Sequence, residues 1–125
     1  MLNPNVPAWF EIPAVDLDRA QRFYEGLLAT GLRREVMGYQ AMAVFPVPDD
    51  KQLSTGALVA REGDTPRAEG TTVYLSVRSV DAVLERVESG GGRVLVPRTE
   101  LPEGMGCYAL FVDSEGNRVG LWSAD

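Results

Sequence analysis

The residues with chemistry to offer are one carboxylate, one guanidinium and several aromatic rings at alternate positions of short apolar segments. Trp9 and Glu11 lie two positions apart near the start of the chain, and Arg118 and Trp122 lie four apart near its end. In a strand, side chains separated by an even number of residues point to the same face. Aromatic walls with a few charged anchors are typical of small-molecule pockets. We therefore predict a ligand site, with Glu11 as its candidate catalytic acid or base.

The set of possible metal ligands is poor. The chain has no histidine and a single cysteine, Cys107, whereas transition metals in proteins prefer imidazole, thiolate and carboxylate ligands. We predict no metal and no cofactor. A carboxylate-only site for a hard ion such as Mg²⁺, built on Glu11, stays open as an alternative. Cys107 itself is predicted to be a small buried strand residue.

Length and charge narrow the class of protein. A chain of 125 residues predicts a single domain over residues 1–125 with one core. Its 12 basic and 18 acidic residues give a formal charge of −6, which disfavours nucleic acid as a partner. No apolar run reaches the roughly twenty residues of a membrane span. One cysteine and no basic-then-apolar leader predict a cytoplasmic protein.

The chain repeats its hydrophobic pattern at a spacing of about 63 positions, so that Ile12 matches Leu75 and Leu17 matches Val80. The first module (about 8–61) has predicted strands at 8–13, 32–37, 40–45 and 54–61, with a helix capped by Asp16 and ended by Gly31. The second module (about 71–123) has predicted strands at 71–77, 93–97, 107–112 and 118–123, with a helix capped by Ser79 and ended by 90–92. Residues 62–70 are the predicted linker. Each module therefore has the order βαβββ.

Two motifs inside this repeat point to a family. The segment from Val15 to Tyr24 (VDLDRAQRFY) follows the first strand, and the turn 113–117 (DSEGN) precedes the last. With these motifs the chain resembles the vicinal oxygen chelate superfamily, which includes glyoxalase I, extradiol dioxygenases and bleomycin-binding proteins. The resemblance implies an α+β fold in which two βαβββ modules form a curled, cup-shaped mixed sheet with helices outside. It also implies a homodimer.

The same resemblance implies where metal ligands would lie. In metal-using relatives they occupy the concave face, at positions that correspond here to Trp9, Ala57, Thr72 and Gly120. None of these four side chains is a plausible ligand of a divalent metal.

Strand alternation and the repeat together predict the concave face of the cup. Trp9 and Glu11 face it while Phe10 and Ile12 face the helices. The predicted ligand-binding residues are Trp9, Glu11, Thr72, Tyr74, Tyr108, Arg118 and Trp122. Tyr39, Met42 and Met105 are further candidates for its wall. The competing interpretation is that Trp9 packs on Trp122 and that Glu11 only pairs with Arg118.

Three functions follow from these observations. The leading hypothesis is a metal-free protein that binds a small aromatic or cationic molecule in the cup, as the resemblance to bleomycin-binding proteins implies. The first alternative is a lyase or isomerase, with displaced metal ligands or with Glu11 as acid or base. The second is a non-catalytic scaffold subunit with a filled cup. The sequence leaves open whether the protein is an enzyme.

Overall fold

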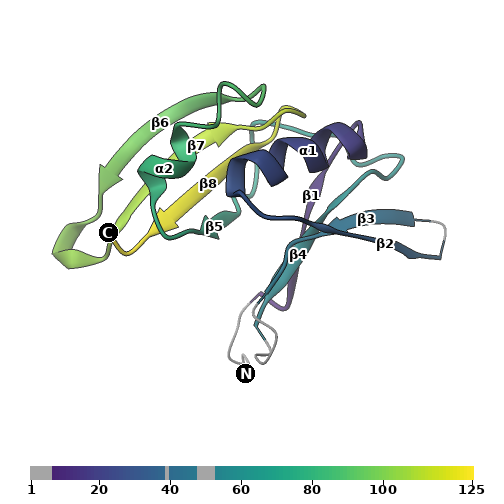
Figure 1. The fold of residues 1–125 in the computed structure, drawn as a ribbon, viewed down its shortest axis with the longest axis horizontal. Coiled ribbons are helices and arrows are strands. Elements are labelled where there is room, and N and C mark those ends of the chain that lie inside the picture. Colours follow the sequence, from purple (N-terminus) through teal and green to yellow (C-terminus); the bar gives the residue numbers. More distant parts are fainter. Residues whose placement is uncertain (1–6, 39, 48–52) are drawn as a thin grey trace.

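The computed structural model describes residues 7–38, 40–47 and 53–125 and consists of two four-stranded sheets with two helices (Figure 1). The first module comprises β1 (Trp9–Pro13), α1 (Leu17–Leu28), β2 (Arg33–Met37), β3 (Gln40–Val44) and β4 (Thr55–Val59). The second comprises β5 (Tyr74–Ser76), α2 (Val80–Leu84), β6 (Arg93–Glu100), the 3₁₀ turn η1 (Pro102–Gly104), β7 (Cys107–Val112) and β8 (Arg118–Ser123). The predicted α+β fold of two βαβββ modules is confirmed.

Both modules use the same sheet topology. The strand orders are β1-β4-β3-β2 and β5-β8-β7-β6. In each sheet the first strand runs parallel to the last, and the remaining pairs are antiparallel. The parallel pair needs a crossover, which the helix and the two strands after it supply, whereas antiparallel neighbours need only a short connection. Among the described residues no ladder joins β1 to β5, so each sheet ends in an unpaired strand edge.

The helix α1 forms because apolar residues recur every three or four positions behind an N-cap. The Asp16 carboxylate accepts the Arg19 N–H at 3.0 Å, and the buried positions are Leu17, Ala20, Phe23, Tyr24 and Leu27. The predicted end at Gly31 is wrong: Ala29 adopts the left-handed conformation (φ 53°) and its N–H bonds to the Glu25 carbonyl. Three residues, 30–32, then separate this cap from the next strand.

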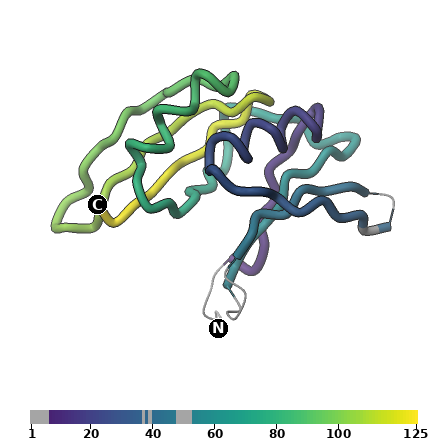
Figure 2. The backbone as a smooth tube through the Cα atoms, viewed as in Figure 1, coloured from purple at the N-terminus to yellow at the C-terminus, as the bar shows by residue number. Residues whose placement is uncertain are grey.

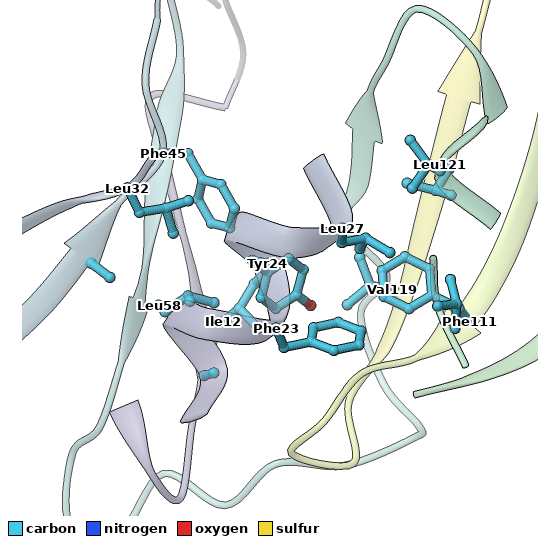
Figure 3. Packing of buried hydrophobic residues seen from close by; sticks show 14 of the residues in the cluster. Ile12, Phe23, Tyr24, Leu27, Leu32, Phe45, Leu58, Phe111, Val119 and Leu121 are labelled. Atoms are coloured by element: carbon cyan, nitrogen blue, oxygen red, sulfur yellow. The ribbon is translucent and has the colours of Figure 1, made fainter. Parts of the chain in front are cut away.

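The core lies between the two sheets and surrounds α1. Tyr24, Phe23 and Leu27 of α1 lie between Phe45 and Leu58 of the first module and the buried side chains of the second (Figure 3). The second module contributes Cys107, Ala109, Phe111, Val119 and Leu121 to the same cluster. Cys107 is fully buried in β7, as predicted. Away from α1 the sheets diverge (Figure 2), which leaves one face of each free of the core.

The turn between β7 and β8 locks the two modules together. The Glu115 carboxylate accepts the N–H groups of Val15 and Asp16 at 2.9 and 2.8 Å, and it pairs with Arg19 at 2.7 Å. Burial would raise the pKa of Glu115, but hydrogen bonds from Arg19, the Asp16 N–H and Ser114 lower the pKa to about 2. The charge therefore sits permanently at the positive N-terminus of α1.

Three predicted boundaries in the second module are wrong. β5 covers only Tyr74–Ser76 instead of 71–77, because Arg118 donates to the Gly70 carbonyl and holds the preceding residues in a loop. α2 ends at Leu84, since the N–H groups of Arg86 and Val87 bond three residues back, to the Val83 and Leu84 carbonyls. β6 continues to Glu100 instead of ending at 97, because two register shifts allow it to keep pairing with β7 as far as Cys107.

No helix in the described part of the chain is long and apolar enough to cross a membrane.

The predicted hairpin turn 113–117 is present, with Gly116 at φ 100° and the Asp113 N–H bonded to the Asn117 carbonyl at 2.9 Å. Only glycine adopts this backbone conformation without strain.

Candidate functional site

Each sheet has an outer face, defined here as the face turned away from the core. Ile12 is buried in the core and Phe10 packs against it, whereas Trp9 and Glu11 are exposed on the outer face, as the alternation predicts. Pairing extends these faces across the sheets, since Glu11 lies opposite Ala57 and Tyr74 lies opposite Gly120. The outer face of the first sheet also carries a separate buried aliphatic cluster: Met42, Val44, Ala57 and Val59.

A groove of about 1220 Å³ separates the two sheets at the unpaired edges of β1 and β5. Four of the seven predicted ligand-binding residues line it: Trp9, Glu11, Thr72 and Tyr74. Its remaining lining is largely apolar and includes Phe10, Leu28, Leu75, Val77 and Val83. Tyr108, Arg118 and Trp122 do not line this groove, and Tyr39 lies outside the described residues.

Glu11 is held by a network that the sequence did not indicate. Its carboxylate pairs with Arg61 at 3.2 Å and accepts the Trp9 indole N–H at 3.3 Å. Arg61 also donates to Gln40 and pairs with Asp64 at 2.8 Å. The hydrogen bond to Glu11 is the main reason why the pKa of Arg61 is raised. The guanidinium neutralises Glu11, which is 35% exposed and not buried among aromatic rings as an acid–base role would favour.

The competing interpretation, in which Glu11 only pairs with Arg118, is wrong. Arg118 donates to the Thr72 hydroxyl at 3.1 Å and to the Gly70 carbonyl at 2.7 Å. The reason is which strands are neighbours. Glu11 is in β1, which pairs with β4, and the chain after β4 continues to Arg61. Arg118 is the first residue of β8, which belongs to the other sheet. Likewise, the indole N–H groups of Trp9 and Trp122 bond to Glu11 and to Met105.

Three aromatic side chains form a strip on the outer face of the second sheet: Tyr74, Tyr108 and Trp122, called here the aromatic strip. Tyr108 lies opposite Trp122 in the β7–β8 pair, and the rings of Tyr74 and Tyr108 meet edge to face with centroids 6.4 Å apart. Tyr74 is 50% exposed and Trp122 is 36% exposed. Exposed rings side by side on a sheet are a surface on which planar molecules can stack.

Glycines let these rings lie against the backbone. A Cβ at Gly120 would lie 2.3 Å from the Tyr74 ring, so this ring covers the glycine directly. A Cβ at Gly106 would lie 3.0 Å from the Trp122 indole nitrogen, which bonds to the Met105 carbonyl at 2.9 Å. Both rings therefore lie close to the sheet backbone, and the Trp122 ring is also fixed by its N–H bond.

The four positions at which the family resemblance implies metal ligands are unsuited to a metal in the structure as well. Trp9 and Ala57 flank Glu11, Thr72 bonds to Arg118, and Gly120 lies under Tyr74. No group of three or more His, Cys, Asp or Glu residues in the described ranges could hold a metal ion. This set of side chains does not fit the family's metal.

Fold, repeat and site together define a protein of the vicinal oxygen chelate type. The sequence profile of the Glyoxalase/Bleomycin resistance protein/Dioxygenase superfamily matches residues 7–121. The chain belongs to this superfamily.

Curated relatives are distant and mostly longer. The chain is 28% identical over 123 residues to CFP32 of Mycobacterium tuberculosis, described as a candidate glyoxylase, with 95% of this chain and 46% of that protein covered. It is 27% identical over 132 residues to the anthracycline biosynthesis protein DnrV of Streptomyces peucetius, with 95% and 47% covered. The chain thus spans about half the length of these relatives.

Solved structures show the same fold. A glyoxalase/bleomycin resistance protein from Albidiferax ferrireducens superposes with a TM-score of 0.73 at 17% identity, covering 93% of this chain and 96% of that one. Glyoxalase I from Zea mays gives a TM-score of 0.69 at 23% identity, covering 94% and 45%.

Proposed function

We propose that this protein binds a planar aromatic small molecule, without a metal, between the outer aromatic surfaces of its two modules. The observation that carries the proposal is the set of exposed rings at the groove and beside it. Trp9 and Tyr74 line the groove, and Tyr108 and Trp122 extend the aromatic surface from Tyr74 across the second sheet. Apolar walls with a few polar anchors are the usual composition of such sites.

The electrostatics favour a neutral ring system over a cationic ligand. A free carboxylate near the rings would add attraction for a cation, but both oxygens of Glu11 are already bonded, one to Arg61 and one to Trp9. What remains available for binding is ring surface, so stacking supplies the main attraction. The naming of DnrV as an anthracycline biosynthesis protein supports a polycyclic aromatic ligand.

A thermal-shift and titration experiment tests this proposal. The ligand set contains an anthracycline, a hydroxylated anthraquinone and saturated ring compounds of similar size and polarity. Ligand at 100 times its Kd stabilises the folded state by about 2.7 kcal/mol, so we expect a raised Tm with the planar compounds alone. Equal shifts with planar and saturated compounds, or no shift with either, would contradict stacking.

Substitution of Tyr74 tests the position of the site. Tyr74→Ala removes the ring shared by the groove and the aromatic strip, and we expect it to weaken binding about tenfold, the value of one stacked ring. Val36→Ala is the matched control, because Val36 is also an exposed strand residue but lies in β2, away from the groove. If both variants bind like the original protein, the ligand site is elsewhere.

Metal independence has its own measurement. Protein purified without a tag or chelator is incubated with Mg²⁺, Mn²⁺, Fe²⁺, Ni²⁺ and Zn²⁺, dialysed and analysed for bound metal. We expect no stoichiometric metal and the same ligand affinity with and without chelator, because the family's ligand positions carry no suitable side chain. Stoichiometric metal that is lost in Glu11→Gln would favour an enzyme with displaced ligands instead.

We further propose a cytoplasmic homodimer. The unpaired edges of β2 and β6 and the exposed apolar side chains of Val36, Leu95 and Met105, which do not line the groove, are features that a second subunit would cover. The single buried cysteine agrees with a reducing compartment. Sedimentation velocity over a range of concentrations tests the assembly: a single monomeric species throughout would refute the dimer.

A further inference from the structure

The linker between the modules encloses a second, smaller cavity. It has a volume of about 180 Å³ and lies between β1, the start of β8 and residues 65–73. The linker is held there by backbone and side-chain bonds: Arg118 N–H to the Arg67 carbonyl at 3.2 Å, and Arg67 N–H to the Asn117 side-chain oxygen at 3.3 Å. The cavity is thus part of the folded linker, and its volume equals that of about six water molecules.

Two guanidinium groups line this cavity without a carboxylate partner among the described residues. Arg118 and Arg67 form no ion pair, in contrast to Arg19, Arg34 and Arg61. A guanidinium has five N–H donors. Arg118 donates its Nε and Nη2 hydrogens to two neutral oxygens, those of Thr72 and Gly70. These bonds fix the orientation of the guanidinium but do not neutralise its charge, and the Nη1 hydrogens are left for a ligand.

The rest of the lining is compatible with an anion. The hydroxyl groups of Thr65 and Thr71 add two possible donors. Two carboxylates also line the cavity, but Glu11 is neutralised by Arg61, which leaves Glu69 as the only acidic group there without an ion pair among the described residues. Among the described residues, the cavity lining thus carries two guanidinium groups without an ion pair, Arg118 and Arg67, and one such carboxylate, Glu69, in a protein whose formal charge is −6.

We propose that this cavity binds a small oxyanion group, carried by a carboxylate or a phosphate, through Arg118 and Arg67. Guanidinium groups bind such oxygens through charge-assisted and often paired hydrogen bonds. The cavity shares Glu11, Thr71 and Val73 with the large groove, so an acidic substituent of a molecule in the groove reaches it directly. The site does not depend on the proposed aromatic ligand, since a free ion would also occupy it.

The test uses ions that carry no ring, so that its outcome is separate from that of the aromatic proposal. Inorganic phosphate and acetate are titrated into the full-length protein at low ionic strength, and amide signals of Thr65 and Thr71 are followed by ¹H–¹⁵N NMR. We expect saturable shifts at these residues, and the ion that binds more tightly identifies the group. Absence of saturable binding of both ions would overturn the proposal.

Three variants and a control sharpen the test. Arg118→Gln and Arg67→Gln should each weaken binding at least about tenfold, whereas Glu69→Gln should strengthen it by removing the competing carboxylate. Arg93→Gln is the control, because Arg93 lies in the same row of the sheet, two strands from Arg118, outside the cavity. Equal weakening by the control would show general charge attraction and refute the site. The Arg67 side chain is exposed and forms no ion pair among the described residues, so Arg67→Gln decides the test if Arg118→Gln is unstable.

Discussion

The two modules agree where they face the core and differ where they face outward. Leu58 and Leu121, which occupy matching positions of the repeat, are both fully buried in the same core cluster. The next residues along each strand, Val59 and Trp122, also match in the repeat, yet Val59 is buried in an aliphatic cluster and Trp122 is 36% exposed. Packing around α1 constrains the inner faces equally, whereas the outer faces were free to acquire different properties.

The glycines show the same contrast in a single type of contact. Each module places a glycine of its last strand directly opposite an aromatic residue of its first strand: Gly56 opposite Phe10, and Gly120 opposite Tyr74. In the first module this pair points to the core, and in the second it points outward. The same glycine–aromatic pair therefore contributes to the core in the first module and leaves the Tyr74 ring exposed in the second.

The largest expected effect tests the equality of the inner faces. Leu58→Ala and Leu121→Ala each leave a cavity in the shared core, and we expect each to lower the free energy of unfolding by about 3 to 4 kcal/mol. Urea denaturation measures both. Leu95→Ala, at a partly exposed position of β6, should cost much less. If only one of the two buried substitutions were costly, the modules would not share a single cooperative core.

The next effect tests the opposite directions of the glycine contacts. A Cβ at Gly56 would lie 2.2 Å from the Phe10 carbonyl oxygen, a backbone atom that cannot move without separating β1 from β4. At Gly120 the three atoms nearest to the Cβ all belong to the ring of Tyr74, which is half exposed and able to rotate away. We expect Gly56→Ala to cost about 2 to 3 kcal/mol and Gly120→Ala clearly less. Equal costs would mean that the Tyr74 ring is as confined as the backbone.

The sequence was sufficient to predict what depends on pattern along one chain segment. The limits of β7 and β8 follow from alternation and from the turn 113–117, and the N-caps Asp16 and Ser79 follow from residue type. Alternation also correctly assigned Trp9 and Glu11 to the face of the sheet opposite the helices and the core. These features are local, so a single segment contains all the information that they require.

The sequence was insufficient where the answer depends on which strand lies beside which. Alternation gave the face of Glu11 but not its neighbour, and so Arg61 was missed although it lies two positions after the end of β4, the strand that pairs with β1. The predicted cup placed all seven ligand-binding residues around a single site. In the structure four of them line the groove, and Arg118 lines the smaller cavity. How far the two sheets diverge is set by the packing of α1, which no segment pattern encodes.

The smallest expected effect concerns how the two helices begin. The N-terminus of α1 is held by the charged Glu115, whereas the N–H groups of Val80 and Ala82 in α2 bond to the hydroxyls of Ser123 and Ser79. A carboxyl whose pKa falls to about 2 from an ordinary 4.5 stabilises the folded state fully above pH 4.5. This contribution is lost progressively as the pH falls from about 4.5 toward 2, because the unfolded chain takes up the proton first.

Matched variants separate the two kinds of helix start by pH. Glu115→Gln should cost about 2 kcal/mol at neutral pH, with half-exposed Arg19 limiting the loss, and should flatten the fall in stability between pH 4.5 and 2. Ser123→Ala should cost about 1 kcal/mol at every pH, because a hydroxyl does not titrate, so its curve should run parallel to that of the original protein. Urea denaturation at a series of pH values distinguishes them. If the stability-versus-pH curves of both variants ran parallel to that of the original protein, the loss of stability in acid would not come from the Glu115 contact. The two modules would then be held together by the buried hydrogen bond between Tyr24 and Asp113 and by the core.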